Sequence, residues 1–159
     1  MEIMENTVEI LVADDEPSVA LALKAALKFC GYSAHSVSDG QAALEQIRAE
    51  PGRFAALVTD HTMPRLGGLA LVRALRDAAF TGRVVLVSAF LTQEIEEQYR
   101  LLGVDQILSK PFNIERLRGA MDRALHPNGA SRKTVRPSTR GEGTPLRIHA
   151  LPRHNPEAD

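Results

Sequence analysis

Short apolar runs alternate with longer amphipathic segments between residues 8 and 126. Three of the runs are nearly continuous in apolar residues, namely VEILVA (8–13), FAALVT (54–59) and VVLVS (84–88). Runs of this kind indicate strands that are buried on both faces, as in parallel sheets. VDQILS (104–109) predicts a weaker strand, and YSAHSV (32–37) a still weaker one that suits the edge of a sheet.

Between these runs, apolar residues recur at helical spacing. The first such segment follows Pro17, which the first turn of a helix tolerates, and ends at Gly31. Further helical patterns cover residues 44–47, 69–75, 95–102 and 114–125, with Asn113 as the expected N-cap of the last. The order βαβαβαβαβα predicts a doubly wound α/β domain with a five-stranded parallel sheet and right-handed crossovers. Five strands fit the flavodoxin-like order 2-1-3-4-5, which places the two weak strands at the edges.

The composition changes near His126, which divides the 159 residues into two predicted parts. Residues 1–126 form the expected folded domain. Residues 127–159 hold five of the nine prolines and carry six Lys or Arg against three Asp or Glu. Because apolar residues there are sparse and follow no period, we expect this C-terminal tail to be disordered. We interpret the tail as a solvated linker, with a partner-binding segment as the alternative.

The overall composition excludes several classes of protein. Hydrophobic residues make up 44% of the chain, enough for a core, and the net charge of −1 gives no general attraction to nucleic acid or acidic membranes. The single cysteine, Cys30, fits a reducing compartment. Neither a signal peptide nor an apolar stretch of about 18 residues is present. We therefore expect a soluble cytoplasmic protein that does not enter a membrane.

Polar residues follow the predicted strands at the edge where open α/β sheets bind ligands. They are Asp14 and Asp15 after the first strand, Asp60 after the third, Ser88 after the fourth and Lys110 after the fifth. Taken singly, the aspartates suit turns or caps, the serine a cap and the lysine a solvated surface. Their occurrence together, one set per strand end, favours a common site.

This set of side chains suits phosphoryl transfer to a carboxylate. Mg²⁺ prefers oxygen ligands, which Asp14 and Asp15 can supply together with Asp60, and the metal relieves the repulsion between them. Asp60 can act as a nucleophile that forms an acyl phosphate. Lys110 offers a fixed cation for the phosphoryl oxygens, and the Ser88 hydroxyl can donate to one of them.

Four motifs, ILVADDE, LVTDHTMPRLGG, LVSA and LSKPF, resemble in this order the receiver domain of bacterial response regulators, over residues 8–126. The resemblance implies that Asp60 is the phosphoacceptor and that Lys110 contacts the phosphoryl group. It implies that Ser88 is the switch hydroxyl. The implied Mg²⁺ ligands are Asp14, Asp15, Asp60 and the backbone carbonyl of Thr62. The resemblance further implies a cis bond before Pro111 and a loop after the acceptor shaped by Met63, Pro64 and Gly68.

One position departs from the family pattern. Three residues before the lysine, receiver domains often have an aromatic ring that turns inward on activation, and here the residue is Ile107. Phe90 can take over that role by packing differently in the two states, or it is a loop residue that simply packs. We favour the second interpretation of Phe90.

The resemblance also implies partners. A sensor histidine kinase or a histidine phosphotransfer protein would donate the phosphoryl group, and a downstream protein would dock on the fourth helix, fifth strand and fifth helix. We expect a chemotaxis-regulator-like single domain that is a signalling protein and not a turnover enzyme, although it assists its own phosphorylation and dephosphorylation. No DNA-binding segment is evident after residue 126. A monomer and a phosphorylation-dependent homodimer both stay open.

Two other classes of function compete with this hypothesis. A receiver-like interaction module would regulate a partner without phosphate turnover; the intact acidic residues argue against it, and Ile107 leaves it open. An enzyme with a doubly wound fold is the other alternative. The segment ADDEPS lacks the glycines of a dinucleotide site, which argues against a nucleotide-binding enzyme. An aspartate-dependent phosphatase would place its nucleophile on the first strand beneath a substrate cap, and neither feature is evident in the sequence.

Overall fold

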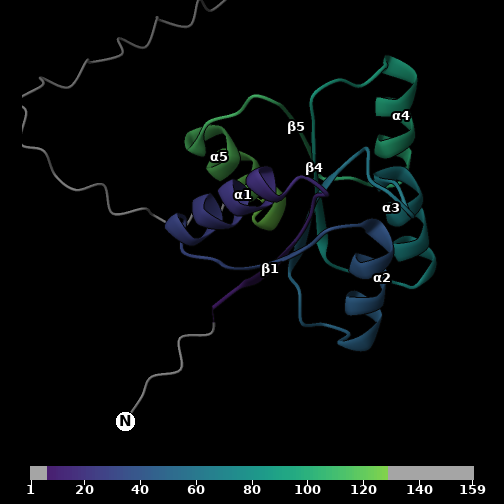
Figure 1. Cartoon of the computed structure of the whole chain (residues 1–159), viewed down its shortest axis with the longest axis horizontal. Helices are drawn as coiled ribbons and strands as arrows, with labels where there is room; N and C mark the ends of the chain where they lie inside the picture. Colours follow the sequence, from purple (N-terminus) through teal and green to yellow (C-terminus); the bar gives the residue numbers. More distant parts are fainter. Residues whose placement is uncertain (1–6, 129–159) are drawn as a thin grey trace, which may run out of the picture.

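Strands and helices alternate along residues 7–128, the part of the chain that the computed structural model describes (Figure 1). The strands are β1 (Glu9–Ala13), β2 (Ser33–Val37), β3 (Ala56–Asp60), β4 (Arg83–Ser88) and β5 (Gln106–Ser109). The helices are α1 (Pro17–Phe29), α2 (Gly40–Ala49), α3 (Gly68–Asp77), α4 (Gln93–Leu101) and α5 (Ile114–Leu125). Residues 129–159, nearly all of the predicted disordered tail, lie outside the described residues, so the boundary near His126 stays a prediction.

The five strands form one parallel sheet in the order β2-β1-β3-β4-β5, which confirms the predicted order and the two predicted edge strands. Strands β1, β3 and β4 are buried on both faces, and Leu11 of β1 and Leu57 of β3 are both 0% exposed. The chain leaves β1 toward β2 and later returns to the opposite side of β1 to form β3. The carboxyl ends of β1 and β3 therefore meet at the topological switch point, where sheets of this kind bind ligands.

Helices α1 and α5 cover one face of the sheet, and α2, α3 and α4 cover the other (Figure 1). Successive residues of β1 point to opposite faces, so Ile10 packs with Leu27 of α1 and Met121 of α5, whereas Leu11 packs with Leu75 of α3. Burying each such side chain stabilises the fold by about 1.5–3 kcal/mol. Within residues 7–128, no helix combines the length and the apolar composition needed to cross a membrane.

Local signals in the sequence account for the start of α5, near the site, and for the end of α1. The side chain of Asn113 accepts a hydrogen bond from the backbone N–H of Arg116 at 2.9 Å, which confirms the predicted N-cap of α5. A cap of this kind contributes about 1 kcal/mol and fixes the chain shortly after Lys110. Gly31 ends the α1 segment with a φ of 93°, a left-handed conformation that glycine adopts without a steric penalty.

Helix α4 is held on the domain most firmly near its carboxyl end, while Ile95 in its first turn is partly buried. Tyr99 is 0% exposed and is the one buried side chain of this helix. From α3, the Arg76 guanidinium donates hydrogen bonds to the carbonyl oxygens of Leu102 and Gly103, both at 2.9 Å. The amino end begins at Thr92, whose hydroxyl caps the first turn of its own helix. The two ends of α4 are therefore held differently.

Candidate functional site

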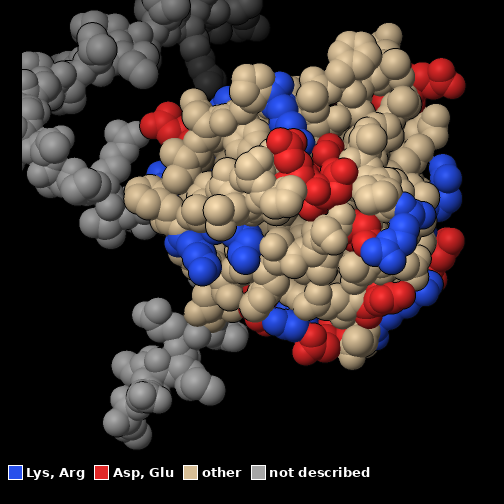
Figure 2. Space-filling model, viewed as in Figure 1, with Lys and Arg blue, Asp and Glu red and all other residues tan. Residues whose placement is uncertain are grey.

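Polar residues from four strands meet at the carboxyl edge of the sheet. Asp14 directly follows β1, Asp60 is the last residue of β3, Ser88 is the last residue of β4, and Lys110 directly follows β5. Figure 2 shows carboxylate groups gathered near the middle of the view, between α1 on one side and α3 and α4 on the other in Figure 1. The structure thus brings the predicted site residues to one edge, and their chemical roles stay predictions.

Three carboxylates form the centre of this site. Asp14, Asp15 and Asp60 each offer an oxygen atom, and these atoms lie within 4.8 Å of one another. The side chain of Asp14 is 1% exposed and that of Asp60 is 14% exposed, while Asp15 lies at the surface. Negative charges this close together, partly withdrawn from water, repel one another, so the cluster favours the approach of a cation.

Lys110 supplies one positive charge to the cluster. Its Nζ lies 3.4 Å from Oδ2 of Asp14 and 3.3 Å from Oδ2 of Asp60. Burial pushes the pKa of Lys110 down, but the charges of Asp60 and Asp14 outweigh burial and hold the pKa above its ordinary value of 10.5. The ammonium group is therefore present at neutral pH. The bond between Lys110 and Pro111 is cis, as the family resemblance implied.

Asp14 is the most constrained of the three carboxylates. Burial raises its pKa above the ordinary 3.8, and this outweighs the hydrogen bond from the backbone N–H of Glu16 at 2.9 Å and the charge of Lys110. The ionised form is thus held at some cost in stability, which a bound cation would offset. Mg²⁺ fits this donor set, because it is a hard ion that prefers one or two carboxylates together with other oxygen atoms.

The loop after Asp60 is held closely against the domain. The backbone N–H of His61 donates to Oδ1 of Asp60 at 2.7 Å, and the His61 carbonyl accepts from the N–H of Gly68 at 2.8 Å. A Cβ atom at position 68 would lie 2.4 Å from the Asp60 carbonyl oxygen, so only glycine fits there. Arg65 adopts a left-handed φ of 65° and forms an ion pair with the buried Asp39 at 2.8 Å.

The remaining predicted residues lie around this loop and at the end of β4. The Ser88 hydroxyl donates to the carbonyl oxygen of Phe90 at 3.4 Å, a long hydrogen bond that leaves the hydroxyl easily redirected. Thr62, whose carbonyl is a predicted metal ligand, lies in the exposed loop two residues after Asp60. Met63 is 8% exposed and packs into the core between the sheet and α3.

One contact of this site is not indicated by any pattern in the sequence. Tyr99 of α4 is buried, and its hydroxyl oxygen lies 2.6 Å from Nδ1 of His61, a partner 38 residues away in the chain. Ile107 packs against the same apolar cluster as Tyr99. Phe90, which we expected to pack, is 80% exposed, so that expectation was wrong. Tyr99 packs with Val84 and Leu86 of β4 between α4 and the sheet, while Phe90 lies in the loop before α4 with its ring exposed.

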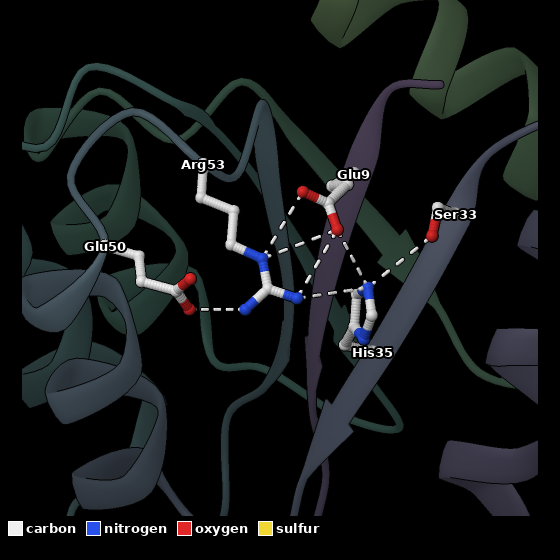
Figure 3. A network of polar contacts seen from close by, with 5 residues as sticks. All are labelled: Glu9, Ser33, His35, Glu50 and Arg53. Atoms are coloured by element: carbon white, nitrogen blue, oxygen red, sulfur yellow. Dashed lines mark hydrogen bonds and ion pairs between the residues drawn. The ribbon is translucent and has the colours of Figure 1, made fainter. Parts of the chain in front are cut away.

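A second charged cluster lies near the amino ends of the strands β1 and β3 (Figure 3). Arg53 forms ion pairs with Glu50 and with Glu9, the latter at 3.3 Å, and Nε2 of His35 lies 3.0 Å from Oε1 of Glu9. The Arg53 guanidinium also lies over the ring of Phe54, 4.7 Å from its centre. No motif in the sequence indicated this cluster, because Glu9 and Arg53 are 44 residues apart.

A doubly wound parallel sheet with an acidic cluster and a facing lysine at its switch point is the arrangement expected of a receiver-type signalling domain. The chain belongs to the response regulator receiver domain family, whose model matches residues 10–122. The family consists of signalling domains of two-component systems.

Comparisons with individual proteins agree with this assignment. The chain is 39% identical over 121 residues to the response regulator MprA of Mycobacterium bovis (strain BCG / Pasteur 1173P2), an alignment that covers 75% of this chain and 50% of MprA. The chain therefore spans about half the length of the curated relatives it matches. Among solved structures, it is similar to the Vibrio cholerae chemotaxis protein CheY4, with a TM-score of 0.69, 26% identity and coverage of 75% of this chain and 99% of that one. A sensor protein from Polaromonas sp. JS666 gives a TM-score of 0.66, 31% identity and coverage of 74% and 95%.

Proposed function

We propose that Asp60 accepts a phosphoryl group in a Mg²⁺-dependent reaction and that the modification changes the surface that a partner protein contacts. One observation above all supports Asp60 as the acceptor. Lys110 contacts two carboxylates, and the side chain of Asp60 is 14% exposed whereas that of Asp14 is 1% exposed. An incoming donor can therefore reach Asp60, while Asp14 is enclosed.

In the proposed reaction, an oxygen of Asp60 attacks the phosphorus of a phosphohistidine on a histidine kinase or phosphotransfer protein, the P–N bond breaks, and the imidazole leaves. Lys110 lies 3.3 Å from Asp60 and stabilises the negative charge on the phosphoryl oxygens. The Ser88 hydroxyl would exchange its long bond to Phe90 for one to a phosphoryl oxygen. The same site would later assist hydrolysis of the acyl phosphate.

Asp14, Asp15 and Asp60 would hold Mg²⁺, together with the carbonyl oxygen of Thr62. The three carboxylates lie within 4.8 Å of one another and carry more negative charge than Lys110 balances. When bound, the metal neutralises charge on the carboxylates and on the phosphoryl oxygens. Asp14 is kept in place for this purpose by the hydrogen bond from the Glu16 N–H at 2.9 Å.

The output surface in this proposal consists of α4, β5 and α5. A phosphoryl group adds about −1.5 to −2 charges and three acceptor oxygens, which draw Ser88 toward them and shift the loop into α4. Residues Gln93, Glu94, Glu97 and Arg100 are exposed on α4 and available to a downstream protein. We further propose a cytoplasmic location, where such donors and partners act.

Intact-protein mass spectrometry tests the proposal directly. The protein is incubated with acetyl phosphate and Mg²⁺, and we expect the mass to increase by one phosphoryl group. Asp60→Asn should show no increase and keep the thermal midpoint of the wild type within a few degrees. Asp77→Asn, at an exposed position at the end of α3, is the matched control and should react like the wild type.

Two results would contradict the proposal. Uptake of a phosphoryl group by Asp60→Asn would mean that another residue is the acceptor. Absence of uptake in the wild type, both from acetyl phosphate and from a phosphorylated histidine phosphotransfer protein, would favour an interaction module that does not use phosphate.

A further inference from the structure

Tyr99 joins helix α4 to the residue that follows the proposed phosphoacceptor. Its ring is 0% exposed, and its hydroxyl oxygen lies 2.6 Å from Nδ1 of His61. The two rings meet edge to face, with their centres 5.6 Å apart. Since Tyr99 is the one buried side chain of α4, the His61 ring contacts the residue through which this helix packs most deeply on the domain.

His61 is in direct contact with Asp60 as well. Its backbone N–H donates to Oδ1 of Asp60 at 2.7 Å, and its side chain reaches Tyr99. The start of α3 closes the space around this pair, because a Cβ atom at Gly68 would lie 2.8 Å from the Tyr99 hydroxyl and 2.4 Å from the Asp60 carbonyl oxygen. In so closely packed a region, we expect a shift of His61 to move Tyr99 as well.

The hydroxyl of Tyr99 remains protonated in this environment. Burial, and next the negative charge of Asp60, raise the pKa of Tyr99 well above its ordinary value of 10. The hydroxyl therefore keeps a proton that it can donate, and Nδ1 of His61 lies within hydrogen-bonding distance of it. The contact thus joins the loop after Asp60, which carries His61, to α4, which carries Tyr99.

The residue that would otherwise perform this coupling is absent from β5. Ile107 occupies the position where receiver domains often carry an aromatic ring, and it packs against the cluster that contains Tyr99, Val72 and Leu86. An aliphatic side chain at this position offers neither a hydroxyl group nor a ring that can change its hydrogen bonds. Tyr99 supplies both from the neighbouring helix.

We infer that the His61–Tyr99 contact couples phosphorylation of Asp60 to the position of α4, with Tyr99 as a positioning residue on the helix itself. This inference rests on the proposed phosphorylation of Asp60. A phosphoryl group changes what the His61 N–H can donate to, the His61 ring moves with its backbone, and the hydrogen bond to Tyr99 favours a different position of α4. Coupling of this kind is reciprocal, so a partner bound to α4 would also change phosphorylation at Asp60.

Hydrogen-exchange mass spectrometry with and without phosphorylation tests the coupling. Intact mass, measured on the same samples, reports phosphoryl uptake, and peptides covering residues 91–103 report α4. In the wild type we expect uptake and a clear change of exchange in these peptides. Tyr99→Phe removes only the hydroxyl, so uptake should persist while the change in α4 falls at least threefold.

The second tyrosine of the chain provides the matched control. Tyr32 is 7% exposed and packs on the other face of the sheet, beneath α1 and α5. Tyr32→Phe also removes a hydroxyl from a largely buried ring, and it should keep both the uptake and the full response of α4. A general loss of stability would instead affect the two variants alike.

His61→Ala tests the same contact from its other side, and it remains informative if Tyr99→Phe folds poorly. It leaves the backbone N–H to Asp60 in place but removes the partner of Tyr99, so we expect the same loss of the α4 response. Because one contact is involved, the double variant should lose no more than either single variant.

The possible failures are distinguishable. If Tyr99→Phe and His61→Ala take up phosphate and α4 responds as in the wild type, the coupling inference is wrong and the proposed function stands. If the double variant loses clearly more than each single variant, the two residues act separately and the inference is also wrong. If the wild type takes up no phosphoryl group from any donor, the proposed function fails and the coupling fails with it.

Discussion

Two clusters of charged side chains lie at opposite ends of the strands, one at the amino ends and one at the carboxyl ends, and their charges are balanced differently. At the amino-terminal ends of the strands, Arg53 contacts both carboxylates of its cluster, Glu9 and Glu50, and His35 contacts Glu9 (Figure 3). At the carboxyl edge, three carboxylates face the single ammonium group of Lys110. In the first cluster each carboxylate has a basic side chain as its partner, whereas in the second three carboxylates share one ammonium group, and an added cation would neutralise the excess negative charge. An unbalanced, partly buried cluster is typical of a functional site.

Strand β1 contributes a carboxylate to each cluster, and their pKa values shift in opposite directions. Glu9 begins the strand, and the hydrogen bond from Arg53 is the main reason that its pKa lies below the ordinary value of 4.5. Asp14 follows the same strand, and burial raises its pKa above the ordinary 3.8. One strand thus carries a carboxylate that is stabilised in its charged form and another that is not.

The largest expected difference between the clusters is in the effect of removing the basic side chain, Lys110 in one and Arg53 in the other, on phosphoryl uptake. Lys110→Met should slow phosphoryl uptake from acetyl phosphate by roughly 100-fold or more, because it removes the fixed cation beside Asp60. It should also tighten Mg²⁺ binding, since a competing positive charge is gone. Arg53→Met, the matched change at the other edge, should alter neither. Initial rates by mass spectrometry and a Mg²⁺ titration measure both effects, and a similar slowing by Arg53→Met would overturn the comparison.

Asp14→Asn should separate function from stability. The folded protein holds this carboxylate at a raised pKa, so its ionisation at neutral pH destabilises the fold, and the neutral amide should raise the metal-free thermal midpoint by about 2–5 °C. Mg²⁺ should raise the midpoint of the wild type, because it binds the folded state only. The variant should lose most of this increase. A lower midpoint for metal-free Asp14→Asn would show that the carboxylate stabilises the fold by itself.

Glu9→Gln should have the smallest effect, and one that depends on pH. The folded pKa of Glu9 is lower than its unfolded value, so its contribution to stability is fully present above about pH 4.5 and is lost as the pH falls through the folded pKa. Urea unfolding from pH 7 down to pH 3 should therefore show a difference from wild type that disappears in acid. Phosphoryl uptake should not change. Glu94→Gln, on the exposed face of α4, is the control, and a pH-independent difference for Glu9→Gln would contradict the assignment.

The predictable part of the site follows from parallel topology. Once the hydrophobic pattern had identified the strands, the residues after each carboxyl end were expected to share one edge, and Asp14, Asp60 and Lys110 do so. Ser88 lies at the end of β4 for the same reason. The strand order followed similarly, since the two least apolar runs suit positions with only one neighbouring strand.

The contacts that the sequence did not predict depend on which side chains compete for the same space. Tyr99 fits the apolar pattern of its helix, and nothing in that pattern shows that its hydroxyl reaches His61. Phe90 is as apolar as any core residue, yet Tyr99 and Ile107 occupy the interior and leave it exposed. The pairing of Glu9 with Arg53 likewise becomes visible only when β1 and the segment before β3 lie side by side.

The hydrogen bonds from Arg76 make the carboxyl end of α4 a pivot. This end is tied to α3 through Leu102 and Gly103, whereas the amino end continues into the loop that contains the exposed Phe90. A helix of nine residues is about 13 Å long, so a tilt of about 15° around that pivot displaces the first turn by about 3 Å and hardly moves the last. The first turn carries Glu94 and Glu96. A partner that binds one tilt of the helix in preference to the other would discriminate best by contacting these acidic residues near the amino end.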